Sequence, residues 1–217
     1  MVAFVFQKLL DQGGPSGPNV EAAIDWFSDQ AQSSITPVRP LQVIRGVDPK
    51  QHTPQRFKKR LRMGRYEWGR MIMFQYDPKN KATMPYYDKF PMGFIIDVQQ
   101  DNFLMMNMHY LPPALRASVM DQLYGYLPLM EGEEPQDGDK LMMMPQPYKI
   151  LKRYRRLRWY KGCLKRYLNS NVQSRIVTIY PKEWNMALFM PTTRTFRGAS
   201  KNAIWRDTWR KGRGQRI

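Results

Sequence analysis

Two apolar runs joined by a short polar segment dominate the middle of the sequence. Met92–Val98 and Phe103–Met108 each have the length of a strand, and the residues between them, Gln99–Asn102, are all polar. Strands that are separated by about four turn-forming residues typically pair as an antiparallel hairpin. An earlier apolar run, Met71–Tyr76, ends at the turn-forming pair Asp77-Pro78, and we expect it to be another strand.

The last third of the chain contains three further candidate elements. Residues 148–168 have apolar side chains on one side and Lys and Arg on the rest, which predicts a basic amphipathic helix, or two helices broken near Gly162. Residues 172–180 have the composition of a strand. A turn at 181–184 then leads to a partner strand over residues 186–190.

Two other segments have helical signals. Pro112-Pro113 ends the hairpin and begins a helix that runs through Tyr124, because proline suits the first helical turn. A short helix with one narrow apolar stripe follows Asn19, a good N-cap, and we expect it to dock on the core or on a neighbouring subunit. Together the elements predict an α+β fold: a small antiparallel sheet or partial barrel, packed by two helices, with extended N- and C-terminal arms.

These elements divide the chain into three predicted parts. Residues 1–66 are an N-terminal arm with the short docking helix and a basic run, residues 67–191 are the α+β core domain, and residues 192–217 are a basic, aromatic tail that orders on binding. An acidic loop at 130–140 does not have the EF-hand spacing, and we expect a surface loop. We expect no membrane span, because no apolar run is long enough, and no signal peptide.

The positive charge is concentrated in the last third of the sequence. The net charge is +17; residues 146–217 contain 19 of the 35 Lys and Arg and two of the 18 acids, so residues 1–145 are neutral overall. Such a region attracts phosphate backbones through its electric field and through counterion release. The alternatives are a surface that promotes solubility or an arm that binds an acidic protein.

Aromatic residues alternate with cations in the same region. Tyrosines and Trp159 interleave with Lys and Arg between residues 148 and 167, and Trp205 and Trp209 lie in the tail. Aromatic faces stack on unpaired bases while cations hold phosphates, a combination that suits single-stranded or frayed ends. The alternative is that the tyrosines form the core side of a helix. The candidate nucleic-acid or partner-binding residues are Lys152, Arg153, Arg155, Arg156, Arg158, Lys165, Arg166, Arg194, Arg197, Trp205, Arg206, Trp209, Arg210, Lys211, Arg213 and Arg216.

Groups that carry catalysis are scarce. His52 and His109 are the two histidines, and neither has metal-ligand spacing, so we expect His109 to be a packed, hydrogen-bonded residue. Neighbouring lysines would lower the pKa of Cys163, the single cysteine, yet a small buried hydrophobe is the favoured interpretation. Four aspartates suit turns and strand ends as well as a magnesium site: Asp77, Asp88, Asp97 and Asp101. We expect no catalytic residue, no metal and no cofactor, and a protein that is not an enzyme.

Three sequence strings are specific enough to indicate a family. They are Tyr76-Asp77-Pro78-Lys79 with Met84-Pro85-Tyr86-Tyr87-Asp88-Lys89-Phe90-Pro91, then Asn107-Met108-His109-Tyr110-Leu111-Pro112-Pro113-Ala114-Leu115-Arg116, and Tyr180-Pro181-Lys182-Glu183-Trp184. The most specific parts are residues 86–91 and 109–113. The strings resemble virion proteins of large contractile-tailed bacteriophages of the T-even-like type, which are often called DNA-end protectors. The motif residues that carry the resemblance are Tyr86, Tyr87, Asp88, Phe90, Pro91, His109, Tyr110, Pro112 and Trp184.

The resemblance implies a non-enzymatic protein of the phage particle. A protector of this type sits at the end of packaged DNA and shields it from host exonuclease. The favoured hypothesis therefore places residues 149–166 and 194–216 on DNA or at the DNA exit channel. The alternative is a neck or baseplate assembly protein whose arms staple neighbouring virion subunits without binding DNA. Both hypotheses predict several copies in a symmetric assembly that forms in the host cytoplasm. Other neck, tail or baseplate proteins are then the partners, with DNA as a further candidate and no membrane.

Overall fold

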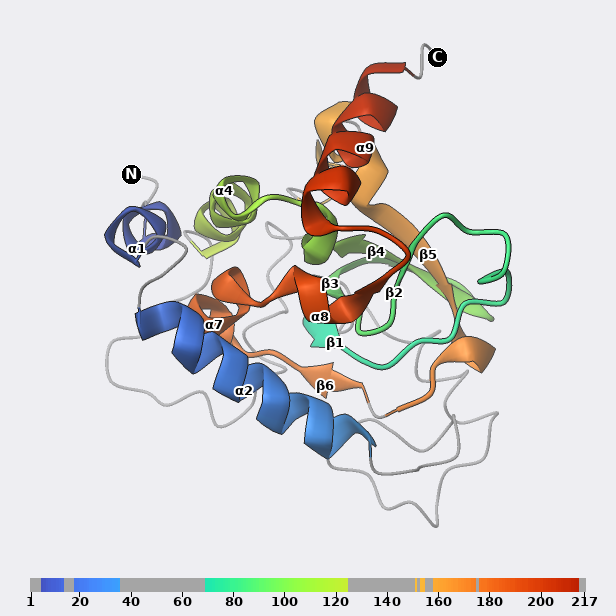
Figure 1. Ribbon diagram of the computed structural model, residues 1–217, viewed down its shortest axis with the longest axis horizontal. Coiled ribbons are helices and arrows are strands. Elements are labelled where there is room, and N and C mark those ends of the chain that lie inside the picture. Colours follow the sequence, from blue (N-terminus) through green and yellow to red (C-terminus); the bar gives the residue numbers. More distant parts are fainter. Residues whose placement is uncertain are drawn as a thin grey trace.

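The chain forms an open antiparallel sheet with helices around it (Figure 1). The computed structural model describes residues 5–13, 18–35, 69–124, 151, 153–154, 158–174 and 176–214. In spatial order the strands of the main sheet are β5 (Leu164–Leu168), β4 (Asn102–Asn107), β3 (Met92–Val98), β1 (Met71–Met73) and β6 (Val177–Thr178). A second sheet pairs β2 (Tyr87–Asp88) with β7 (Phe196–Arg197). The predicted α+β class with a small antiparallel sheet is therefore confirmed.

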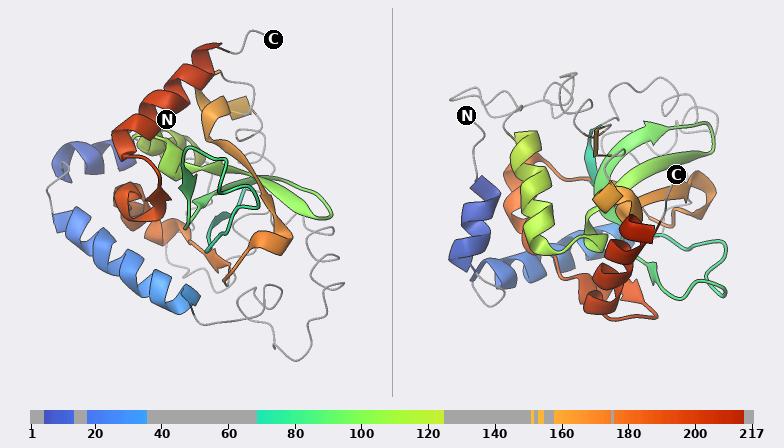
Figure 2. Two further views of the ribbon diagram at one scale, coloured as in Figure 1. Left: turned by 45° about the vertical axis from the view of Figure 1, so that its right-hand side comes forward. Right: turned by 90° about the horizontal axis from the view of Figure 1, so that it is seen from above.

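The helices lie in two places around the sheet (Figures 1 and 2). On one side of the sheet are α1 (Val5–Gly13), α2 (Pro18–Ile35), α4 (Pro113–Tyr124) and α7 (Trp184–Phe189). Apart from these, α9 (Lys201–Gly214) packs on the 3-10 helix η3 (Arg158–Cys163), which leads into β5. The other short helices of the described residues are η2 (Met108–Tyr110), η4 (Asn169–Asn171), η5 (Pro181–Glu183) and α8 (Thr192–Thr195).

The predicted hairpin is present and forms the centre of the sheet. β3 and β4 pair along their length with one β-bulge, and the Gln99 amide donates to the Asn102 carbonyl at 2.8 Å to close the turn. The two backbones approach closely at Gly93, where a Cβ atom would lie 1.9 Å from the Met106 carbonyl oxygen. The sequence therefore needs glycine at this position of an otherwise bulky apolar strand.

The sheet separates two hydrophobic cores, because neighbouring residues of a strand face opposite ways. Met71 belongs to the large core on the helix side and Ile72 to the core on the other side. On the helix side, the Trp184 ring is 1% exposed and packs edge-on against Phe94, with centroids 5.2 Å apart. The second core is aromatic and contains Ile72, Phe74, Tyr76, Ile95, Phe103, Met105, Tyr167 and Val172.

The N-terminal helices dock on this chain's own core. Asp121 of α4 accepts hydrogen bonds from the Phe6 and Gln7 amides at 2.7 and 3.1 Å, so a side chain of another helix satisfies the first turn of α1. α2 buries Ala23 and Phe27 and packs on α7. The sequence left open whether the helix after Asn19 docks on the core of its own chain or on a neighbouring subunit. The structure shows that it docks on the core.

Residues 186–190 were predicted as a strand, and this prediction is wrong. They lie in or directly after the helix α7. An apolar run of five residues does not distinguish a strand from a helix. The deciding signal is the preceding turn, in which Pro181 occupies the first helical position and the Glu183 carboxylate accepts from the Tyr180 amide at 2.9 Å.

The prediction of a basic helix over residues 148–168 is also wrong for its last five residues. Residues 164–168 form β5, which pairs with β4, and residues 158–163 form the 3-10 helix η3. A strand is favoured here because the edge of β4 offers unpaired backbone groups and because Tyr167 can then face the second core, where it is 4% exposed.

The C-terminal segment is folded, which differs from the predicted tail that orders on binding. Residues 192–197 form α8 and β7, and α9 follows. Ser200 is the N-cap of α9, because its hydroxyl accepts from the Ala203 amide at 3.4 Å. Ile204 and Thr208, four residues apart, are 0% and 4% exposed and form the face that packs on η3.

Some predictions concern residues outside the described part of the chain. These are the acidic loop at 130–140, the basic run near residue 60, and His52. Within the described residues, none of the helices has both the length and the hydrophobicity that a membrane span requires.

Candidate nucleic-acid interface

A pocket of about 400 Å³ opens where four segments far apart in the sequence meet, one of which contributes Tyr110 of η2. Residues 76–88 form one wall, β5 forms the second, and Lys211 of α9 closes the third side. Tyrosines and cations dominate the lining. The tyrosines are Tyr76, Tyr86, Tyr87, Tyr110 and Tyr167, and the cations are Lys79, Lys165, Arg166 and Lys211.

The pairing of β2 with β7 brings the C-terminal segment beside this pocket. Asp88 lies opposite Phe196, and the Lys89 amide donates to the Thr195 carbonyl at 2.8 Å. Gly198, directly after β7, has a φ of 92°, a conformation that L side chains rarely adopt, and a Cβ there would lie 2.4 Å from the Pro85 carbonyl oxygen. The chain therefore needs glycine at this crossing before it turns into α9.

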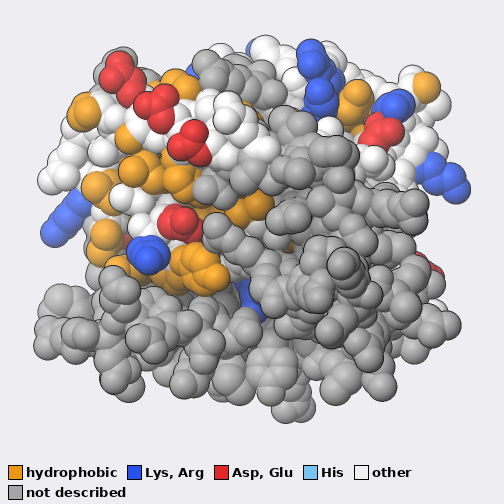
Figure 3. Space-filling model, turned by 90° about the horizontal axis from the view of Figure 1, so that it is seen from below, with side chains coloured by type: hydrophobic (Ala, Val, Ile, Leu, Met, Phe, Trp, Pro, Cys, Tyr) orange, Lys and Arg blue, Asp and Glu red, His pale blue; other side chains and the backbone are white. Residues whose placement is uncertain are grey.

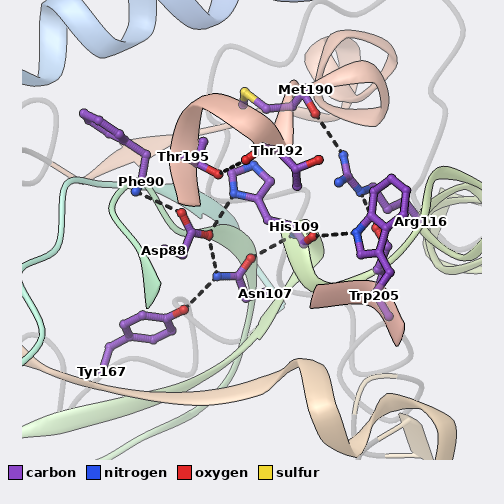
Figure 4. A network of polar contacts seen from close by, with 11 residues as sticks. Asp88, Phe90, Asn107, His109, Arg116, Tyr167, Met190, Thr192, Thr195 and Trp205 are labelled. Atoms are coloured by element: carbon purple, nitrogen blue, oxygen red, sulfur yellow. Dashed lines mark hydrogen bonds and ion pairs between the residues drawn. The ribbon is translucent and has the colours of Figure 1, made fainter. Parts of the chain in front are cut away.

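A buried polar cluster holds Asp88 in place at the pocket (Figure 4). The Asp88 carboxylate accepts from the Phe90 amide at 3.0 Å and from the Asn107 side-chain amide at 2.9 Å, and it lies 2.9 Å from His109 Nδ1. Asn107 Nδ2 also donates to the Tyr167 hydroxyl at 2.8 Å. A carboxylate is costly to bury without partners. The cluster thus explains how Asp88 can be only 4% exposed.

His109 is a packed, hydrogen-bonded residue, as the sequence predicted. Its side chain is 0% exposed, and its Nε2 atom has no hydrogen-bond partner among the described residues. Its backbone carbonyl accepts from the Trp205 indole at 3.1 Å (Figure 4). Its ring lies against Phe196. His109 therefore joins η2, β2 and α9, and the pocket does not include it among its lining residues.

The outer wall of the pocket is held by Asp207 of α9. Tyr86 donates its hydroxyl hydrogen to the Asp207 carboxylate, and Lys211 Nζ forms an ion pair with the same carboxylate at 2.7 Å. Burial alone would raise the pKa of Asp207, but the hydrogen bonds from Lys211 and Tyr86 lower it. Burial and the Asp207 carboxylate both raise the pKa of Tyr86. The Tyr86–Asp207 hydrogen bond and the Lys211–Asp207 ion pair together hold the Tyr86 ring beside α9.

Lys165 is a half-buried cation of the pocket that has no described carboxylate partner. Its Nζ atom lies 4.1 Å from the centroid of the Tyr110 ring, and no described carboxylate is within ion-pair distance. Burial and the nearby charge of Lys211 lower the pKa of Lys165 from an ordinary 10.5 to about 8. Burial and the charge of Asp88 raise the pKa of Tyr110, so this ring stays a neutral phenol.

Further cations extend from the pocket to the surface. Arg166 is exposed, and its guanidinium donates to the side chains of Gln99 and Asn102 at 2.7 and 2.8 Å, which are neutral partners. Arg206 and Arg210 are exposed on α9. On the face that Figure 3 shows, by contrast, described acidic and basic side chains occur together with hydrophobic ones.

The structure brings some of the predicted contact residues together. Lys165, Arg166 and Lys211 line the pocket with the motif residues Tyr86, Tyr87, Asp88 and Tyr110. Arg153 and Arg197 are exposed outside this lining, and Trp209 is 40% exposed on α9. Lys152, Arg155, Arg156 and Arg216 lie outside the described residues, as do the side chains of Arg158, Arg194 and Arg213.

The other motif residues belong to the core and its edges. Phe90 packs edge-on against Phe27, with centroids 5.9 Å apart, and Trp184 fills the helix-side core. Pro91 is buried next to β3, and the Pro112 carbonyl accepts from the first turn of α4. These four residues contribute to the packing and the helix start of the fold.

Sequence reasoning missed several pocket residues. Lys79, Asn80 and the exposed Met84 line the pocket. Lys79 and Met84 belong to the family string, but none of the three was predicted as a contact residue. Asp207 appeared only as a rare acid in a basic region. An acid four residues before Lys211 on a helix is a signal that would have found this ion pair.

The described residues give little support for a metal site or for a reactive cysteine. They contain no group of three or more His, Cys, Asp or Glu side chains that could hold a metal ion. Cys163 is 0% exposed, and its thiol donates to the Tyr160 carbonyl at 2.9 Å. Burial raises the pKa of this thiol to about 12, which overrides the effect of Lys165 and supports the interpretation as a small buried hydrophobe.

Comparison with known proteins identifies the family. No curated protein and no solved structure matched the chain. A sequence model of the family described as Phage T4 terminal DNA protecting protein matches residues 55–212, which include the main sheet, the pocket and most of α9. Because this match spans well over half of the 217 residues, the chain belongs to the family of phage T4 terminal DNA protecting proteins.

Proposed function

We propose that this protein binds the ends of linear DNA in a phage particle and protects them by occupying them. The family provides the phage and DNA-protecting context. The observation that supports end binding most directly is the pocket of tyrosines and cations. Stacking faces and phosphate-binding cations are the two components of sequence-independent binding to unpaired nucleic acid. In duplex DNA, bases become unpaired most readily at an end.

The exposed cations around the pocket have a second role in this proposal. Arg166 lies at the pocket rim on β5, and Arg206 and Arg210 lie on the adjacent helix α9. They bind the backbone phosphates of the duplex behind its end, as Lys and Arg generally do in sequence-independent complexes. The net charge of +17 increases the rate of encounter with DNA.

Protection is steric in this proposal. An exonuclease has to load on a free end, and a protein bound there excludes it without any chemical step. The protein acts as a structural component of the virion, in contact with other proteins of the particle. The absence of enzymatic activity belongs to the same proposal.

The test is exonuclease digestion of linear duplex DNA with increasing protein. Two DNA lengths are used at the same concentration of ends. End binding predicts that the protein needed for half-maximal protection is set by the number of ends and is the same for both lengths. Coating of the whole duplex predicts that the requirement rises in proportion to the number of base pairs.

The control variant is Lys182→Gln, which removes an exposed cation on η5, outside the pocket. It is expected to protect as well as the wild type does. Digestion that continues unchanged at saturating wild-type protein would refute the proposed function. Protection that scales with DNA length would refute binding at ends and leave only general DNA binding.

A further inference from the structure

The pocket has the size of a site for one small ligand. Its volume of about 400 Å³ lies in the range of about 300–1,000 Å³ that is typical of ligand pockets. The end of a duplex presents two paired nucleotides, each with its own sugar and phosphate. A cavity of this size accommodates one of them, so its ligand has to be unpaired.

Lys165 supplies a binding group for an anion. It is a half-buried cation whose described surroundings offer the face of Tyr110 and no carboxylate partner. Burial makes its charged form unfavourable, as does the neighbouring charge of Lys211. A phosphate in the pocket would compensate both effects and replace the hydration that Lys165 has lost.

The acids near the pocket do not fill this role, because their oxygens already have partners. Asp88 is bound by Phe90, Asn107 and His109 in the buried cluster. Asp207 is bound by Tyr86 and Lys211. Among the described residues, the lining therefore contains one buried, fully engaged acid and four cations, and it favours an anionic ligand.

The tyrosines supply faces for a base. Tyr76 and Tyr167 pack edge-on with centroids 4.9 Å apart and belong to the second core. Tyr86 and Tyr87 are half-buried at the pocket, so part of each ring faces it. Stacking on such rings does not depend on the identity of the base, because every base has an aromatic face.

We propose that this pocket binds the unpaired terminal nucleotide of a DNA strand, with its base on Tyr86 or Tyr87 and its phosphate on Lys165. This assignment rests on the proposed function and specifies its ligand. Its consequence is that the protein recognises frayed or overhanging ends of any sequence. The cations on α9 then hold the duplex behind the captured nucleotide.

The test is direct binding, measured by fluorescence anisotropy with no nuclease present. The probes are DNA hairpins with a labelled loop whose open end is blunt, carries one unpaired 5′ nucleotide, or carries one unpaired 3′ nucleotide. A further probe has an abasic residue in the unpaired position, and a dumbbell without ends is the reference. We expect one of the overhangs to bind about tenfold tighter than the abasic probe, since stacking of one base has about this effect.

Two variants assign the effect to the pocket. Lys165→Gln is expected to lower affinity for the preferred overhang about tenfold and to leave affinity for the dumbbell unchanged. Replacing both candidate rings, Tyr86→Leu together with Tyr87→Leu, is expected to abolish the difference between the overhang and the abasic probe. Lys182→Gln is the matched control, and thermal unfolding shows that each variant is folded.

The outcomes separate this assignment from the proposed function. Equal affinity of the wild type for overhang and abasic probes overturns the pocket assignment, as does a folded Lys165→Gln variant that binds overhangs normally. Neither result affects length-independent protection, which is measured on the wild type alone. A wild type that prefers overhangs but does not protect DNA supports the pocket and refutes protection.

Discussion

Gly162 of η3 lies directly against Thr208 of α9. A Cβ atom built on Gly162 would lie 2.7 Å from Thr208 Cγ2 and 2.8 Å from the Thr208 carbonyl oxygen. We therefore expect Gly162→Ala to push α9 away from the domain and to lower the free energy of unfolding by about 1–3 kcal/mol, as overpacking typically does. Urea unfolding measures the change, and proteolysis within α9 should become faster.

Gly13→Ala is the matched control for Gly162→Ala. The nearest atom to a Cβ there is Asn19 Nδ2, the end of a side chain, at 3.3 Å. Because that side chain can move, the control should change stability less. Equal stability of wild type and Gly162→Ala would show that η3 and α9 separate at little cost.

The second prediction concerns the buried carboxylate of Asp88. Asp88→Ala leaves Asn107 Nδ2 with one partner fewer and leaves the His109 ring without its hydrogen bond inside the domain. Because each buried polar group that loses its partner costs about 1–3 kcal/mol, we expect a loss of about 3 kcal/mol in the free energy of unfolding. Chemical denaturation measures this loss.

Asp77→Ala is the matched control in the same segment. Its carboxylate pairs with Lys81 at 2.9 Å on the surface, where both side chains are about half exposed at 48% and 53%. Surface ion pairs contribute little, so stability should hardly change. If Asp88→Ala were as stable as Asp77→Ala, the cluster would not stabilise the fold.

The sequence predicted the centre of the fold well because that part depends on local patterns. The hairpin β3–β4 and the start of α4 at Pro113 follow from strand length, turn residues and the place of proline in a helix. β5 and α7 were assigned wrongly, because neither five apolar residues nor a mixture of cations and tyrosines decides between strand and helix. Their structure is set by which surface is left open for them to pack on.

The pocket was predictable only in part. Tyr86, Tyr87, Asp88 and Tyr110 of the family strings and the cations at residues 165, 166 and 211 were named as candidates from the sequence, and the structure places them at one pocket. That they meet depends on the pairing of β2 with β7, in which each strand has two residues and no periodic pattern. Contact between Lys165 and Tyr110 results from packing between elements far apart in the sequence.

The third prediction concerns the cations of α9. Arg206→Gln and Arg210→Gln remove exposed charges that, in the proposed function, contact phosphates behind the DNA end. Each is expected to weaken binding of all DNA sequences alike and to reduce the slope of log affinity against log salt by about one. Titrations of one duplex at several salt concentrations measure the slope.

Lys182→Gln again serves as the control for these two variants. It removes the same charge from an exposed position on η5 and should leave the salt slope unchanged. An equal fall of the salt slope in all three variants would mean that the slope depends on the net charge of the protein. In that case α9 would make no specific contact with the phosphates.

The last prediction is the pH dependence that Lys165 imposes. Its pKa in the folded protein is about 8, below the ordinary 10.5, so between these values the unfolded chain binds a proton that the folded protein has lost. Stability therefore rises with pH across this window through Lys165. Anion binding needs the charged form, so affinity for a DNA end should fall across the same window.

The rise of stability and the fall of DNA-end affinity with pH distinguish the titration of Lys165 from that of the neighbouring groups. Lys211 and Asp207 on α9, Tyr110 on η2 and Cys163 on η3 face the same site, and all four remain present in a Lys165→Gln variant. Subtracting the pH profile of the variant from that of the wild type isolates the contribution of Lys165. The difference should show affinity falling and stability rising between about 8 and 10.5. Parallel profiles would mean that Lys165 keeps an ordinary pKa and that no phosphate binds to it.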